Sequence, residues 1–181
     1  MKRTKSLRSL LSGGDRRSVA QSNRALALVR SNPEQVAQLA ALARDVDWLV
    51  SLRAMDLLEK LAHEHAEWVE PFKALFIGTL ADSDKWEVRL QVVRALPLFV
   101  WSPKEKRRAI EILLRDAEHP QTFVRAWAVD GLASFAEKNG ELMPKLRRYL
   151  RELEESGSKA LVTRARRIRS RLESSGDSRT N

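Results

Sequence analysis

The chain has 181 residues, of which 43% are hydrophobic and 31% charged, and its formal net charge is +9. This length and composition predict one globular domain with a continuous core and exclude a chain that is disordered throughout. The lack of cysteine excludes disulfides and thiol chemistry and suits a reducing compartment, so we expect a cytoplasmic protein. No apolar run approaches the roughly 20 residues that span a bilayer, so we expect no membrane partner.

The positive charge is concentrated at the two ends of the sequence. Residues 1–30 carry eight basic residues and one acidic residue, and residues 141–181 carry eleven and six, whereas residues 31–80 carry four and eight. Such ends either attract phosphate or an acidic protein or simply solvate the ends of the fold. We interpret residues 1–16 as a basic, flexible arm, with a mitochondrial presequence as the alternative.

Helical patterns then fill the chain as far as residue 173. After an N-terminal helix over 17–31, two sets of helical segments alternate as the first and second helices of four pairs. The first helices are expected at about 33–43, 67–80, 104–117 and 141–155, and the second at about 47–63, 85–99, 121–138 and 158–173. The third pair opens with a capping box, in which Ser102 is the N-cap and Glu105 lies at N3. We predict a repeat domain over 17–173 and a disordered tail over 174–181.

The second helices repeat one apolar pattern at a nearly constant spacing. It starts at Val50, Val88, Val124 and Leu161, in steps of 38, 36 and 37 residues, and keeps a small or branched residue four positions later. A fixed period in this range is typical of a helical solenoid, in which each unit buries its apolar face against its neighbours.

The motif Val-Arg-x-x-Ala/Val-x-x-x-Leu at 88–96 and 124–132 resembles the HEAT repeat, and the stretch SGGDRRS at 12–18 resembles the start of small bacterial HEAT-repeat proteins with no assigned function. This resemblance implies an all-α fold, a right-handed α-solenoid of about four HEAT-like helix pairs plus the N-terminal helix. The motif arginine is replaced by Ser51 in the first copy and Val162 in the last. An arginine ladder between the repeats would therefore be incomplete.

Beside the apolar stripe, a second row of positions runs along each second helix. By the resemblance, second helices line the concave face of a HEAT protein, so this row is a candidate ligand surface. A solvated face crossed by salt bridges between repeats is the alternative. The candidate binding residues are Arg53, Arg94, Trp127, Asp130, Arg164 and Arg167.

Catalytic and metal-binding signals are weak in this sequence. His63 and His65 are two positions apart and point to different sides of a helix, whereas zinc on a helix needs a spacing of four. Trp127 and Asp130 are spaced like the tryptophan and aspartate of the HEAT-like alkylpurine DNA glycosylases, and this single pair is the only enzymatic resemblance. We therefore expect no enzyme, no catalytic residue, no cofactor and no metal.

The function that these patterns favour is that of a non-catalytic scaffold which binds an unidentified protein partner, since aromatic and arginine side chains dominate interface energies. The alternative is nucleic-acid binding by the basic ends, with Lys2, Arg3, Lys5 and Arg8 at one end and Arg164, Arg167 and Arg171 at the other. The sequence predicts neither the partner nor the oligomeric state.

Overall fold

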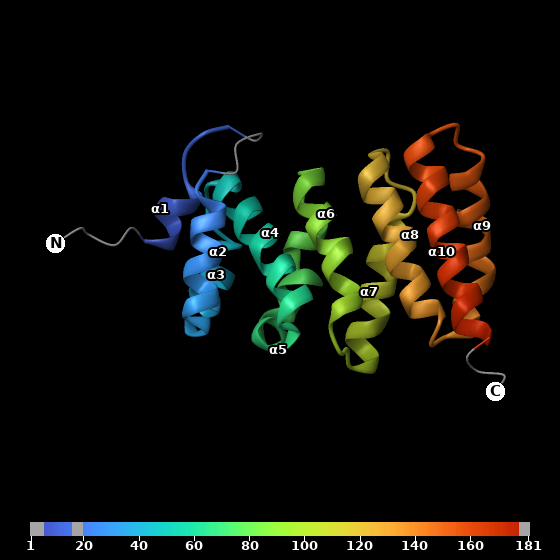
Figure 1. Ribbon diagram of the computed structural model, residues 1–181, viewed down its shortest axis with the longest axis horizontal. Helices are drawn as coiled ribbons and strands as arrows, with labels where there is room; N and C mark the ends of the chain where they lie inside the picture. The colour runs from blue at the N-terminus through green and yellow to red at the C-terminus, as the bar shows by residue number, and fades with distance from the viewer. Residues whose placement is uncertain (1–5, 16–19, 178–181) are drawn as a thin grey trace. The chain divides into compact units, whose positions relative to one another are not determined.

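The computed structural model describes residues 6–15 and 20–177, and the regular elements in these two ranges are α-helices and short 3₁₀ helices, with no strand (Figure 1). Two compact units are present, Met1–Val100 and Trp101–Asn181. Residues 1–5 and 16 of the predicted arm, and residues 178–181 of the predicted tail, lie outside the described residues.

The first unit is built from α-helices and short 3₁₀ helices. Its elements in chain order are α1 (Leu7–Leu11), α2 (Ser22–Ser31), η1 (Pro33–Gln35), α3 (Val36–Leu42), α4 (Trp48–Glu64), α5 (Ala66–Val69), η2 (Glu70–Phe76), η3 (Thr79–Asp82), α6 (Trp86–Ala95) and η4 (Leu96–Leu98). The long helix α4 contacts α1, α2, α3, α5 and α6. Its residues Val50, Ala54, Leu58 and Leu61 are fully buried, so the predicted apolar stripe is the core of this unit.

Two predicted helices of the first unit are shorter than the sequence pattern indicates. The segment predicted as one helix over 67–80 divides into α5, η2 and η3, with Pro71 near the start of η2 and extended backbone at Gly78. Proline removes a backbone donor, and glycine disfavours a continued helix. Likewise α6 ends at Ala95, and Pro97 lies in the short η4 that follows it.

The prediction of a flexible arm is wrong for residues 7–11, which form α1. Leu7, Leu10 and Leu11 lie on one face of this short helix and are 1%, 2% and 0% exposed. Arg8, on the other side, donates two hydrogen bonds to the Asp45 carboxylate, from Nε at 2.7 Å and from a terminal nitrogen at 3.0 Å. The segment is therefore held by apolar contacts and by an ion pair.

Arg53 in the middle of α4 fixes the chain that leaves α1. It is only 5% exposed, and its guanidinium group donates to the backbone carbonyls of Leu11, Gly13 and Asp15 at 2.5, 2.8 and 2.9 Å. Carbonyls at the end of a helix have no partner within that helix, so the arginine acts as a cap supplied by another helix.

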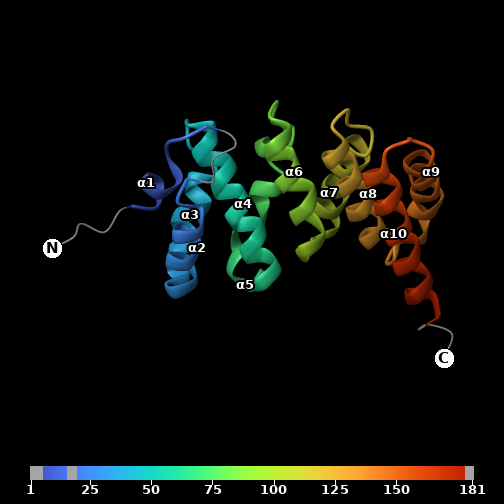
Figure 2. The ribbon, with the colours of Figure 1, turned by 45° about the horizontal axis from the view of Figure 1, so that its top comes forward.

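The second unit contains two complete helix pairs, as predicted. Its elements are α7 (Pro103–Asp116), α8 (Thr122–Ala136), η5 (Gly140–Leu142), α9 (Met143–Glu154) and α10 (Lys159–Asp177). Helix α10 contacts both α8 and α9, as Figures 1 and 2 show. The predicted capping box is present: the Ser102 hydroxyl accepts from the Glu105 amide, and the Glu105 carboxylate accepts from the Ser102 amide. Because α10 continues to Asp177, the prediction of disorder is wrong for residues 174–177.

We predict that Arg53→Met releases the segment after α1. The substitution keeps an apolar stem but removes three hydrogen bonds to backbone carbonyls, of which the one to Leu11 is buried, and charge-assisted hydrogen bonds contribute about 1.5–3 kcal/mol. Hydrogen–deuterium exchange of residues 6–15 should become roughly ten to a hundred times faster, because about 1.4 kcal/mol corresponds to a factor of ten. Arg147→Met, at an exposed position of α9, is the control and should leave this exchange unchanged. Unchanged protection in Arg53→Met would contradict the capping role.

Candidate binding surface

The second helices of the second unit, α8 and α10, bring four of the six predicted binding residues together. On α8 the buried stripe is Val124, Ala128 and Leu132, and Trp127 and Asp130 lie beside it. On α10 the buried stripe is Leu161, Ala165 and Ile168, and the neighbouring row contains Arg164, Arg167 and Arg171. The helix period thus turns two sequence rows into one surface patch.

Arg164 joins this patch into one cluster. Its guanidinium lies over the Trp127 ring, 3.8 Å from the ring centroid, a cation–π contact within the usual range. The same group donates to Asp130 Oδ2 at 2.7 Å. Trp127 is half-buried, so its ring packs on Arg164 and still reaches the surface.

Asp130 also pairs with a second arginine, which lies two turns further along α10. Arg171 lies 2.8 Å from Asp130 Oδ1, donates to the Asp130 carbonyl at 3.2 Å, and also bonds Glu137 at 3.2 Å. The Asp130 side chain is only 12% exposed, and both of its carboxylate oxygens contact a guanidinium. We refer to Trp127, Asp130, Arg164 and Arg171 as the Trp127 cluster.

An open pocket of about 340 Å³ adjoins the Trp127 cluster on α10. Lys159, Thr163 and Arg167 follow one another at a spacing of four on this face, with Ala160 and Arg164 beside them. Lys159 and Arg167 are exposed, and neither forms an ion pair with another residue in the part of the chain that the structure describes. The pocket therefore presents positive charge that is not neutralised locally. Lys159 was not among the predicted residues, since it lies at a repeat position that the row does not include.

Arg53 does not lie on an exposed surface, and this corrects the sequence-based expectation. Its guanidinium is occupied by the three backbone carbonyls described above. The helical period places Arg53 on the predicted row, but it contains no information on the segment from residues 11–15 that covers that position. Arg8, proposed from sequence as a phosphate ligand, is likewise paired with Asp45.

Arg94 lies on α6 and pairs with a buried carboxylate on α4. Its guanidinium is 3.0 Å from Glu59, whose side chain is 0% exposed, and 26% of the Arg94 side chain remains accessible. His63 Nε2 contacts the same carboxylate at 2.9 Å. Burial raises the pKa of Glu59 above its ordinary value, although Arg94 and His63 act in the opposite direction; Asp56 reinforces the rise.

Neither a metal cluster nor a membrane span is found in the part of the chain that the structure describes. No group of three or more histidine, aspartate or glutamate side chains in residues 6–15 and 20–177 is placed to hold a metal ion. No helix in those ranges is both long enough and apolar enough to cross a membrane. His65, one of the two histidines considered from sequence, stacks on Trp68 with ring centroids 3.9 Å apart.

Comparison with known proteins identifies the fold. No family profile and no curated protein matches the sequence. Among solved structures, similarity is found to an engineered protein, with a TM-score of 0.60 and 22% identity over 93% of this chain and 78% of that one. A designed armadillo repeat protein in complex with the peptide (KR)4 has a TM-score of 0.59 and 19% sequence identity, over 92% of this chain and 80% of that one. A computationally designed armadillo repeat protein for modular peptide recognition has a TM-score of 0.59 and 19% sequence identity, over 91% of this chain and 79% of that one.

These similarities, together with the helix order, define the class of protein: an all-α helical repeat solenoid with armadillo-like neighbours. The solenoid predicted from the repeated apolar pattern is therefore confirmed. At 19–22% identity the likeness extends to the fold and no further.

We predict that Asp130 and Arg164 are energetically coupled. A double-mutant cycle with Asp130→Ala and Arg164→Ala should give an interaction energy of about 1 kcal/mol, because this pair is mostly shielded from water. The pair Arg148–Glu118, at 52% and 64% exposure, is the matched control and should give less than about 0.5 kcal/mol. Equal coupling in the two cycles, measured by urea denaturation, would show that shielding does not strengthen the Asp130 pair.

We also predict a pH effect from Glu59. Because its pKa is raised in the folded state, the folded protein holds this proton more tightly than the unfolded chain does. The contribution of Glu59 to the free energy of unfolding is therefore present below the ordinary pKa of 4.5 and is lost as the pH rises through the raised pKa. Glu59→Gln should remove this part of the pH dependence, measured as the urea midpoint from about pH 4 to 7. Asp56→Asn removes only a smaller cause of the raised pKa and should retain most of the effect, because burial is the largest cause. A wild-type slope in Glu59→Gln would contradict the assignment.

Proposed function

We propose that this protein is a non-catalytic scaffold that binds a segment of a protein partner across the α8–α10 surface. The observation that carries the proposal is the Trp127 cluster beside the cationic pocket. Trp127 is half-buried and Arg164 stacks on it. Arg164 also lines the pocket, together with Lys159 and Arg167, whose charges are locally unpaired. Tryptophan and arginine are enriched among the residues that dominate binding energies, and they act best where surrounding contacts exclude water.

The similar structures support this proposal at the level of the fold. Two of them are designed repeat proteins, one in complex with a (KR)4 peptide and one made for modular peptide recognition. The (KR)4 peptide of the first is cationic, and the pocket on α10 is cationic too. We therefore propose a partner segment of the opposite charge, rich in aspartate or glutamate.

We further propose that the repeats are of the HEAT kind. In the second unit each repeat consists of two helices, α7 with α8 and α9 with α10. Two-helix units are typical of HEAT repeats, and three-helix units of armadillo repeats.

Nucleic-acid binding is the second candidate, and the exposed Lys159 and Arg167 favour it. Salt dependence distinguishes it from protein binding. Binding to a nucleic acid releases counterions from the contacted phosphates, so the affinity falls steeply as the salt concentration rises. The glycosylase alternative gains no support from the Trp127 cluster, because both carboxylate oxygens of Asp130 contact arginines.

We predict that reversing the charge of the pocket weakens partner capture. Lys159→Glu with Arg167→Glu places two negative charges on the pocket without touching the contacts of Asp130, and binding should weaken at least tenfold. Lys145→Glu with Arg147→Glu, two exposed positions on α9, makes the same change of net charge and should bind like the wild type. The measurement is affinity capture from nuclease-treated lysate with quantitative mass spectrometry.

Three results would contradict the protein-scaffold proposal. One is that nuclease removes every captured partner, which would favour nucleic acid. Another is that both charge-reversed proteins lose the same partners, which would indicate an effect of net charge alone. The third is that Trp127→Ala, which deletes the central ring of the surface, captures the same partners as the wild type.

A further inference from the structure

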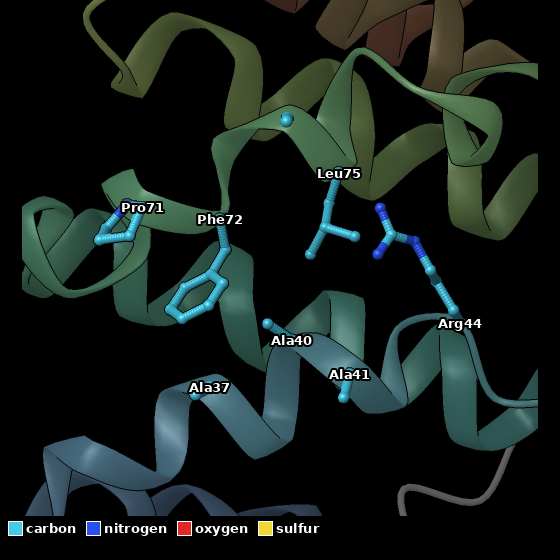
Figure 3. A pocket seen from close by; sticks show the side chains of 8 residues that line it. Ala37, Ala40, Ala41, Arg44, Pro71, Phe72 and Leu75 are labelled. Carbon is cyan, nitrogen blue, oxygen red and sulfur yellow. The ribbon is translucent and has the colours of Figure 1, made fainter.

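A second surface depression lies in the first unit, between α3 and η2. Figure 3 shows Phe72 and Leu75 pointing from η2 toward α3, where Ala37, Ala40 and Ala41 form the opposite wall. The space between them is about 300 Å³. None of these residues belongs to the α8–α10 surface, so this groove is independent of the function proposed above.

The sequence explains why the groove exists. Ala37, Ala40 and Ala41 are spaced at three and four positions, so small side chains share one face of α3 and leave room above it. Opposite them, Pro71 sits near the start of the 3₁₀ helix η2, and Phe72 is only half-buried. Ala37 and Ala41 are exposed. The groove therefore leaves apolar surface in contact with water.

The size of the groove limits what it can hold. Small-molecule and cofactor sites usually measure about 300–1,000 Å³ and enclose most of their ligand. This groove lies at the lower end of that range and is open to solvent, so it suits one or two apolar side chains of a docked segment.

Arg44 adds a charge to one end of the groove. Among the lining residues it is the single charged one, and in Figure 3 its guanidinium lies beside Leu75. Arg44 is exposed, and its side chain forms no hydrogen bond or ion pair within ranges 6–15 and 20–177, whereas its backbone N–H donates to the Ala41 carbonyl at 3.1 Å. The neighbouring carboxylate, Asp45, is already engaged by Arg8 and by the Asp47 amide. An acidic side chain on the occupant would therefore be complementary to Arg44.

We propose that this groove docks an acidic amphipathic helix of a partner protein. One apolar side chain enters the space between Ala41 and Phe72, and an aspartate or glutamate pairs with Arg44. Ala40 and Arg44 are four positions apart, which is about one helical turn. A docked helix therefore presents its apolar anchor and its acidic residue three or four positions apart.

Peptide display tests this proposal on the full-length chain. A library of randomised amphipathic helices is selected on the wild-type protein, and each enriched peptide is then measured by fluorescence anisotropy against variants. Ala41→Gln fills the groove with a side chain that helices tolerate, and Arg44→Glu reverses its charge. The matched controls lie at exposed positions of α2, where Ala27→Gln and Arg24→Glu make the same changes away from the groove.

The proposal expects enriched peptides in which an apolar residue is followed three or four positions later by aspartate or glutamate. Their Kd should rise at least tenfold on Ala41→Gln and on Arg44→Glu, and change less than twofold on the two controls and on Arg167→Glu. Replacing the acidic residue of the peptide by lysine should restore binding to Arg44→Glu. Circular dichroism checks that each variant keeps the wild-type helix content.

Three outcomes would overturn it. One is a selection that enriches no peptide sensitive to Ala41→Gln. Another is a set of groove-dependent peptides that lack the acidic position and bind Arg44→Glu as tightly as the wild type. Loss of binding on Arg167→Glu alone would place the peptides on the α8–α10 surface and would also overturn the groove assignment.

Discussion

The apolar faces of the second helices are the constraint on which both units depend. At most 1% of the surface is exposed at Leu58 and Leu61 of α4 and at Val129 and Leu132 of α8. A single helix could not shield such a face from water alone. Burying one such side chain stabilises the fold by roughly 1.5–3 kcal/mol. Each second helix must therefore be covered by the elements beside it in its unit. The flanking row is then left to polar side chains, which is why the candidate binding residues lie there.

Much of this arrangement could be predicted from local sequence signals. The period of the apolar pattern located α4, α6, α8 and α10, and Ser102 with Glu105 located the start of α7. The divided segment after α4 could not be predicted in the same way, since the pattern of apolar residues continued through Pro71 and Gly78. There the backbone chemistry of two residues outweighs the periodicity.

Long-range contacts account for the predictions that failed. Leu7, Leu10 and Leu11 already have helical spacing in the sequence, but the basic residues around them favoured a flexible arm. The partner that orders them, Arg53, lies about forty residues further on, as its hydrogen bonds to Leu11 and Gly13 record. Conversely, the residues of the Trp127 cluster could be grouped from sequence because one repeat separates them. Their pairing through Arg164 required the structure.

The cap that Arg53 provides has a consequence for the order of folding. Helix α1 has five residues, too few to persist alone in water, and its end is closed by an arginine 42 positions later. During synthesis α1 leaves the ribosome before α4, so the Leu11 carbonyl has no arginine partner until much of α4 has emerged and formed. Helix α1 thus cannot complete its native contacts before α4 forms, and a chain stalled before Arg53 would expose Leu7, Leu10 and Leu11.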